Sequence, residues 1–128
     1  MVVDTSALVA ILLREPDAQR FSEAIDAADQ PVLGSATYVE LTIVALSRGR
    51  IGREVLDEML EQVGIEVVAL TPAIARVAAD AFARYGKGRH PARLNFGDCF
   101  TYALAKERGE PLLFKGNDFS RTDITPAL

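Results

Sequence analysis

The sequence predicts an α/β fold in which a mainly parallel sheet carries helices on both of its faces. Short apolar runs rich in β-branched residues alternate along the chain with longer segments of helical pattern, which is the order found in parallel α/β proteins. The short runs are apolar throughout, as expected for strands that are buried on both faces. Because the chain has 128 residues and no repeat or linker, we expect a single domain spanning residues 1–128.

The individual elements follow from local signals in the chain. Strands are predicted at residues 1–4, 31–35, 65–70 and 111–114, with a last edge strand at 124–125. Helices are predicted at residues 6–13, 15–28, 36–49, 53–64, 71–85 and 96–109. Thr5 or Ser6 is available to cap the first helix, and Pro72 after Thr71 begins the fifth. Helix ends are indicated by Gly49 and Gly109. The face of the helix 53–64 that we expect to be buried is formed by Val55, Met59 and Val63.

Composition is that of a globular protein in a reducing compartment. The hydrophobic fraction is 49% and the charged fraction is 25%, as in ordinary soluble domains. The single cysteine, Cys99, excludes an internal disulfide framework. No apolar run approaches the roughly 20 residues that span a bilayer, and the N-terminus lacks the basic leader of a signal peptide. We therefore expect a cytoplasmic protein without membrane association.

Four acidic residues stand in apolar surroundings or close behind predicted strands. Asp4 follows the first strand directly, and Asp118 follows the strand "LLF" within "KGND". Glu40 lies inside the apolar helix "TYVELTIVAL", and Asp98 lies in the first turn of the helix "FGDCFTYALA". Since ligand sites in parallel α/β sheets lie beyond the carboxyl ends of the strands, these four acids are expected to converge at one edge of the sheet.

Each acid also has an ordinary structural explanation. Asp4 could cap a helix, Asp98 could interact with a helix dipole, and Asp118 could stabilise a turn. Glu40 could pair with a buried arginine. One shared site explains all four more economically, because neighbouring carboxylates repel and a divalent cation keeps them ionised. All-oxygen ligands select Mg²⁺ or Mn²⁺, and such a site suits phosphodiester hydrolysis.

Four segments, "VVDTSALVAIL", "SATYVEL", "LNFGDCFTYALA" and "LLFKGNDFSRTDI", together closely resemble the PIN-domain ribonucleases. More narrowly, they resemble the VapC toxins of bacterial toxin–antitoxin pairs. The resemblance covers the whole chain, in order and with the usual lengths between motifs. It implies a small three-layer α/β/α domain with a central, mainly parallel sheet, and endonucleolytic cleavage of RNA that depends on Mg²⁺ or Mn²⁺.

The resemblance also implies roles for individual residues. Asp4 and Asp98 match the two acids that most directly bind the metal, and Glu40 matches another acid of the catalytic set. Relatives often carry the fourth acid directly after the last strand, where this chain has "KGN". We therefore predict Asp118 in that role, with Asp123 as the alternative. The polar residues expected to orient the acids or a metal-bound water are Ser6 and Asn95.

The resemblance further implies an RNA substrate, a cognate VapB-type antitoxin, and a homodimer that assembles further with the antitoxin. Residues 81–96 contain no acid, and we expect this segment to contact RNA phosphates and offset the net charge of −4. Its candidate contact residues are Arg84, Lys87, Arg89, His90 and Arg93. The antitoxin is expected to lie in an apolar groove and to send an arginine toward the acids. The walls of this groove are expected to come from the helices that begin near Pro16 and Ala36, with Leu12, Phe21 and Leu46 as contributors.

Three other classes of protein remain open from the sequence. A receiver-like phosphorelay domain could use Lys115, but it needs an aspartate at the end of a middle strand, and "PVLGS" and "IEVVAL" have none. A haloacid-dehalogenase-type phosphatase needs a second aspartate two positions after Asp4, where Ser6 stands. A catalytically silent interaction module could use the same fold as a scaffold.

Overall fold

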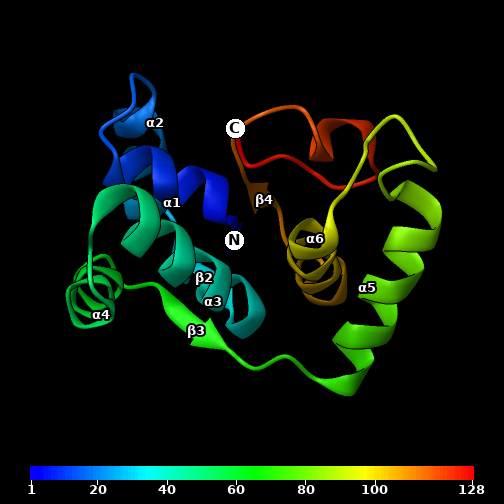
Figure 1. Ribbon diagram of the computed structural model, residues 1–128, viewed down its shortest axis with the longest axis horizontal. Coiled ribbons are helices and arrows are strands. Elements are labelled where there is room, and N and C mark those ends of the chain that lie inside the picture. Colours follow the sequence, from blue (N-terminus) through cyan, green and yellow to red (C-terminus); the bar gives the residue numbers. More distant parts are fainter.

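A computed structural model describes residues 1–128. Four parallel strands form one sheet in the order β3-β2-β1-β4. The strands are β1 (Val2–Val3), β2 (Val32–Gly34), β3 (Glu66–Val68) and β4 (Leu112–Leu113). Helices cover both faces of the sheet (Figure 1). The predicted three-layer α/β/α architecture is therefore confirmed, and its sheet is parallel throughout.

All six predicted helices are present, with some shifted ends. They are α1 (Thr5–Leu12), α2 (Ala18–Asp26), α3 (Ser35–Val44), α4 (Arg53–Gln62), α5 (Pro72–Tyr85) and α6 (Phe96–Arg108). After α3 the chain continues as a short π-helix, Ala45–Gly49, and Arg50 takes the left-handed conformation expected at Gly49 (φ 53°). The edge strand predicted at 124–125 is wrong, because only a single bridge forms between Pro126 and Leu112.

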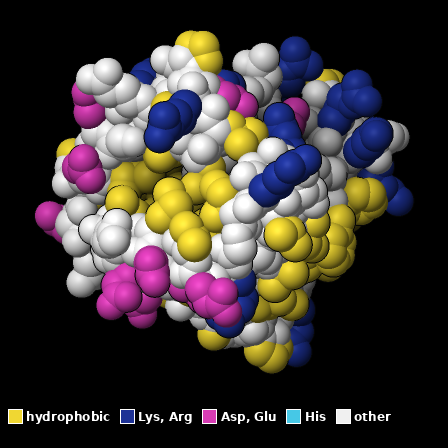
Figure 2. Space-filling view, turned by 60° about the vertical axis from the view of Figure 1, so that its left-hand side comes forward, with side chains coloured by type: hydrophobic (Ala, Val, Ile, Leu, Met, Phe, Trp, Pro, Cys, Tyr) yellow, Lys and Arg dark blue, Asp and Glu magenta, His cyan; other side chains and the backbone are white.

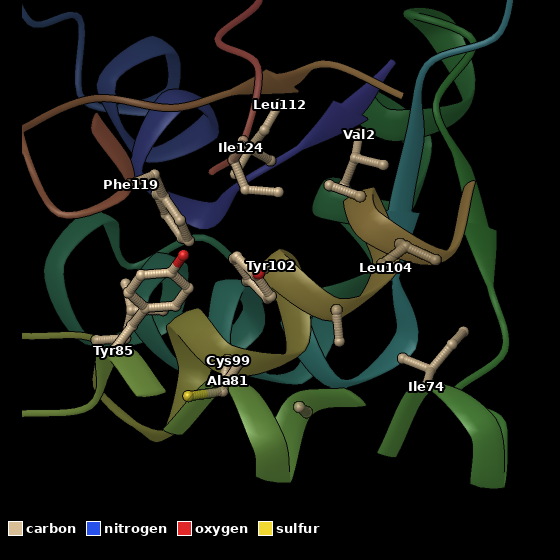
Figure 3. Close-up of a cluster of buried hydrophobic side chains, with 14 of the residues drawn as sticks. Val2, Ile74, Ala81, Tyr85, Cys99, Tyr102, Leu104, Leu112, Phe119 and Ile124 are labelled. Carbon is tan, nitrogen blue, oxygen red and sulfur yellow. The ribbon is translucent and has the colours of Figure 1, made fainter. Parts of the chain in front are cut away.

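The sheet separates two hydrophobic cores, because successive residues of a strand point to opposite faces. Val2, Val32 and Leu112 join the core beneath α5 and α6, where the free Cys99 is also buried (Figure 3). Their sequence neighbours pack on the other face, against side chains of α1, α2 and α4; these neighbours are Val3, Leu33 and Leu113. The strands β1, β2 and β4 thus contribute to both layers of helices, which explains the apolar pairs Val2–Val3, Val32–Leu33 and Leu112–Leu113. The edge strand β3 is more exposed and carries the charged Glu66.

The buried face of α4 differs from the prediction. Leu56 and Leu60 are buried, whereas Val55 and Val63 are 53% and 43% exposed. Two apolar stripes of helical spacing overlap in this segment, and packing against the sheet selects one of them. None of the six helices combines the length and the apolar character needed to cross a membrane.

Candidate functional site

Asp4 lies at the point where β1 passes into α1. Its backbone N–H donates to the carbonyl of Leu113 in β4 (2.9 Å). Its Oδ2 accepts from the backbone N–H (2.9 Å) and the hydroxyl (2.6 Å) of Ser6. Asp4, and neither Thr5 nor Ser6, is therefore the N-cap of α1. The Ser6 hydroxyl also accepts from the N–H of Lys115 (2.9 Å), so Ser6 links Asp4 to the segment after β4.

Asp98 is held at the start of α6 by a capping box. The Asn95 side chain accepts from the N–H of Asp98 (2.9 Å), and Asp98 Oδ2 accepts from the N–H of Asn95 (2.8 Å). Burial is the main cause that raises the pKa of Asp98 to about 7, and the charges of Asp4, Asp118 and Glu40 raise it further. The hydrogen bond from Asn95 acts in the opposite direction and is outweighed.

Glu40 reaches this site from α3 because Gly97 has no side chain. A Cβ at position 97 would collide with Oε2 of Glu40, so the glycine lets the carboxylate lie against the first turn of α6. Burial raises the pKa of Glu40, and the charge of Asp4 adds to the effect. Gly97 was not among the predicted site residues, and its only signal in the sequence is its place directly before Asp98.

The structure separates the two candidates for the fourth acid. Asp118 is exposed, forms no ion pair, and lies near enough to Asp98 for its charge to raise the pKa of that carboxyl. Asp123 accepts hydrogen bonds from the hydroxyl of Tyr102 (2.6 Å) and the ammonium of Lys106 (3.0 Å). The bond from Tyr102 is the main cause that lowers the pKa of Asp123 to about 2. Asp123 is thus engaged in a separate contact.

No basic side chain neutralises the acids of the cluster Asp4, Glu40, Asp98 and Asp118. None of them takes part in an ion pair, so the buried-arginine explanation of Glu40 is wrong. Within the chain, hydrogen bonds reach only one oxygen of Asp4 and one of Asp98. The remaining carboxylate oxygens are free to bind a cation, and unpaired oxygens of this kind fit Mg²⁺ or Mn²⁺.

The four acids are not arranged as a complete metal cage. No group of three or more acidic, histidine or cysteine side chains is spaced to hold one ion. Mg²⁺ commonly binds through one or two carboxylates and retains several water molecules. The pair Asp4 and Asp98, each with one free oxygen, therefore fits such an ion better than a site saturated by protein ligands.

Most of the predicted basic residues gather on the loop before α6. Lys87, Arg89 and Arg93 line an open pocket of about 440 Å³ together with His90. The Arg84 guanidinium lies elsewhere, 4.7 Å from the centre of the Tyr85 ring. The basic pocket is therefore formed by three of the four predicted arginine and lysine residues.

The imidazole of His90 helps to hold this loop in place. Its Nδ1 accepts from the N–H of Ala92 (3.0 Å), and its ring packs edge-on against Tyr85 with 5.0 Å between ring centres. His90 is half-buried and has a structural role in the basic loop.

A hydrophobic pocket of about 60 Å³ lies between α1, α2 and α4. Figure 2, which brings the α4 side of the molecule forward, shows hydrophobic side chains in a hollow with acidic side chains near it. Leu12 lines this pocket as predicted. Phe21 instead belongs to the core, and Leu46 is 63% exposed outside the pocket. The α4 residues that line the pocket and were not among the predicted groove contributors are Leu56, Met59 and Leu60, and Val63 directly after the helix joins them.

A second hydrophobic surface surrounds the start of α6. Phe96 is 78% exposed, and its ring packs edge-on against Phe100 with 4.8 Å between ring centres. Pockets of about 300 and 520 Å³ adjoin this pair. The other exposed hydrophobic residues that line them are Val39, Ile43 and Phe82.

The fold and the acidic site together define a class of protein. The chain belongs to the PIN-domain family, whose model matches residues 1–124. It is 50% identical over 125 residues to ribonuclease VapC30 of Mycobacterium tuberculosis, a match that covers 97% of this chain and 95% of that protein. It is 52% identical over 127 residues to ribonuclease VapC of Mycolicibacterium smegmatis, a match that covers 97% of both chains. The resemblance noted in the sequence is thus confirmed.

Solved structures give the same fold at low sequence identity. VapC20 of Mycobacterium tuberculosis, described as a sarcin–ricin loop cleaving toxin, has a TM-score of 0.74 at 15% identity, over 97% of this chain and 95% of that one. A toxin–antitoxin complex from Klebsiella pneumoniae has a TM-score of 0.71 at 16% identity, over 95% of this chain and 92% of that one. These two similarities support the fold alone.

We predict that Asp98→Asn stabilises the protein when no divalent metal is present. The pKa of Asp98 is raised from 3.8 to about 7. The Asp98 carboxyl therefore contributes its full stabilisation of the folded state below pH 3.8. This stabilisation is lost as the pH rises through about 7. Asparagine keeps the cap and removes the charge. Thermal unfolding in EDTA should show an advantage of Asp98→Asn that grows with pH across this window. Asp80→Asn, at an exposed acid on α5, is the control. A pH-independent difference would contradict the prediction.

Proposed function

We propose that this protein is a metal-dependent endoribonuclease and the toxin of a toxin–antitoxin pair. The observation that carries the proposal is the cluster of four carboxylates without a counter-ion, at the positions of the family's acidic motifs. About half of the residues are identical to those of proteins named VapC ribonuclease. The engagement of Lys115 with Glu15 and Asp17 speaks against the phosphorelay alternative, because this lysine does not face Asp4.

The chain's own residues would prepare the site for phosphodiester hydrolysis. The free oxygens of Asp4 and Asp98 would hold Mg²⁺ or Mn²⁺, which supplies an activated water and stabilises the leaving oxygen when bound. Ser6 fixes the other oxygen of Asp4, and Asn95 fixes the other oxygen of Asp98. Ligand orientation is therefore set by hydrogen bonds that the metal need not displace. Glu40 and Asp118 would orient water and RNA at the margin of the site.

Asp4→Asn and Asp98→Asn should each reduce RNA cleavage at least about 10²-fold while leaving the fold intact, because the metal loses a ligand charge. Cleavage should require Mg²⁺ or Mn²⁺ and cease in excess EDTA. Gel assays on labelled RNA with the Asp80→Asn control measure this, with circular dichroism to verify folding. Full activity in EDTA would exclude the metal mechanism.

Asp118→Asn tests the choice of the fourth acid. It should reduce cleavage, whereas Asp123→Asn should mainly reduce stability, because Asp123 bonds Tyr102 and Lys106. The opposite result, normal cleavage by Asp118→Asn and loss by Asp123→Asn, would assign the role to Asp123.

The basic pocket is proposed to bind RNA phosphates next to the acidic site. It lies on the loop that leads directly into α6, the helix that carries Asp98. Positive charge there would offset the repulsion between RNA and the acidic cluster. Arg84 would contribute less, since it lies over Tyr85 and within 3.9 Å of Asp123.

Charge reversal in the basic pocket should weaken RNA binding and flatten its salt dependence. Arg89→Glu with Arg93→Glu removes two phosphate contacts, which lowers the slope of log affinity against log salt by about 1.5–2. Binding is measured by fluorescence anisotropy in an Asp4→Asn background, so that the RNA stays intact. Arg76→Glu, at an exposed position of α5, is the matched control. Equal salt slopes in both variants would remove the loop from the binding surface.

The antitoxin is proposed to occupy the hydrophobic pocket between α1, α2 and α4 and to send an arginine toward the acids. An acidic cluster without a counter-ion attracts a guanidinium, which can bond carboxylates bidentately. Hydrophobic contacts in the pocket would anchor the rest of the segment, so inhibition and affinity would depend on different residues.

Co-expression with the protein encoded immediately upstream should yield a complex in which RNA cleavage is suppressed. Met59→Asp, in the pocket, should weaken binding of that protein at least about tenfold, because a charge would be buried without a partner. Val55→Asp, at an exposed position of the same helix, should not. Calorimetric titration compares the two. The toxin role fails if no upstream protein binds, or if the complex cleaves RNA as fast as the free chain.

A homodimer is proposed to form through the second hydrophobic surface around Phe96. Exposed apolar side chains that cluster in this way commonly mark a protein interface. Ile43→Asp should convert the dimer to a monomer in light-scattering measurements, and Val55→Asp should not. A wild-type chain that is monomeric at all accessible concentrations would refute the dimer.

A further inference from the structure

Lys115 connects two parts of the chain that the acidic site depends on. Its backbone N–H donates to the hydroxyl of Ser6 (2.9 Å), the residue that also bonds Asp4. Its ammonium donates to Glu15 (2.5 Å) and to Asp17 (2.8 Å), in the turn between α1 and α2. One residue thus fastens the start of the loop after β4 at two points.

The middle of this loop has little other support. Gly116 has a positive φ of 101°, and a Cβ at its position would meet no atom within 4 Å. Asn117 and Asp118 are exposed, and the Asp118 carboxylate takes part in no hydrogen bond or ion pair within the chain. Toward its other end the loop is fixed by the hydroxyl of Ser120, which donates to the carbonyl of Asn117 (2.7 Å), and by Phe119, which is buried against Phe114. The position of Asp118 therefore depends on the two ends of the loop.

We propose that Lys115 is a positioning residue that holds residues 115–118 against the α1–α2 turn and so keeps Asp118 beside Asp98. This inference rests on the proposed nuclease function of the acidic site. An exposed ion pair by itself contributes little. Here the backbone N–H and the ammonium of the same lysine are both held, the first by Ser6 and the second by Glu15 and Asp17. The contacts therefore restrain both the position of residue 115 and the orientation of the chain that follows it.

The charge balance favours positioning over direct contact with RNA. The Lys115 ammonium already faces two carboxylates, which neutralise it and raise its pKa. In return, Lys115 lowers the pKa of Asp17 and compensates part of the negative charge of Glu15 and Asp17. A lysine that bound phosphate would instead need its ammonium free.

Variants on both sides of the contact distinguish the two roles. Lys115→Met and the double variant Glu15→Gln/Asp17→Asn should each lower kcat about tenfold or more with KM nearly unchanged, because the loop loses its restraint. Lys115→Arg should restore most of kcat, since arginine can bridge both acids. In an Asp118→Asn background, Lys115→Met should cause no further loss. Arg53→Met, which breaks a comparable contact with Asp57 on α4, is the control.

Direct phosphate binding would give a different pattern and overturn the proposal. Lys115→Met would then raise KM, whereas Glu15→Gln/Asp17→Asn would free the ammonium and leave KM equal or lower. Additive losses from Lys115→Met and Asp118→Asn would also overturn it.

Hydrogen–deuterium exchange of the metal-free protein tests the restraint without using activity. The amide of Lys115, which is hydrogen-bonded to Ser6 in the wild type, should exchange faster in Lys115→Met and in Glu15→Gln/Asp17→Asn than in the wild type or in Arg53→Met. Unchanged exchange would overturn the positioning role. If the wild type cleaves no RNA with Mg²⁺ or Mn²⁺, the proposed function fails, while the exchange rates still decide whether Lys115 holds the loop.

Discussion

Mutual repulsion among carboxylates that lack a counter-ion is the constraint around which this structure is arranged. Left alone, such groups would move apart or take up protons. Here the backbone prevents separation, because Asp4 caps α1 and Asp98 belongs to the capping box of α6. The stabilisation of two helix ends thus opposes the repulsion, and it leaves one oxygen of each aspartate free. The repulsion between the carboxylates, which is unfavourable without a cation, is thus offset by the favourable helix caps that Asp4 and Asp98 form.

The order of the strands brings these parts together. Because β1 lies between β2 and β4, Asp4 at the end of β1 adjoins the loop that carries Asp118. The crossing of α3 and α6 at Gly97 adds Glu40 from a third segment. Val2 and Val3 supply one side chain to each core, so the strand that presents Asp4 is held from both faces. The packing of β1 in both cores therefore fixes the position of Asp4 at the edge of the sheet where the chemistry is proposed.

The sequence was informative where a local rule decides the outcome. The short apolar runs became strands, of which β1, β2 and β4 are buried and the edge strand β3 is mostly exposed. Thr71–Pro72 and Gly109 marked helix ends as expected. It was less informative where tertiary packing chooses between equivalent patterns, as in α4, whose segment carries two apolar stripes. It also gave no sign that Gly97 admits Glu40 or that Lys115 engages Glu15 and Asp17, because these contacts join segments distant in the chain. The acids themselves could be chosen as candidates, because burying a charge in apolar surroundings is costly without a compensating interaction. The residues that contact them in the fold could not be predicted.

Asp4 combines the observed cap of α1 with its proposed role as a metal ligand, and this limits how the gene could drift once selection for activity is lost. Replacement by a residue that cannot cap would weaken α1 by about 0.5–2 kcal/mol, a sizeable share of the stability of a small domain. Asparagine or serine would remove the carboxylate of the proposed metal ligand and still cap the helix. Inactive descendants that stay folded should therefore be enriched in asparagine and serine at position 4. Either residue at that position would indicate that activity was lost while the fold was retained.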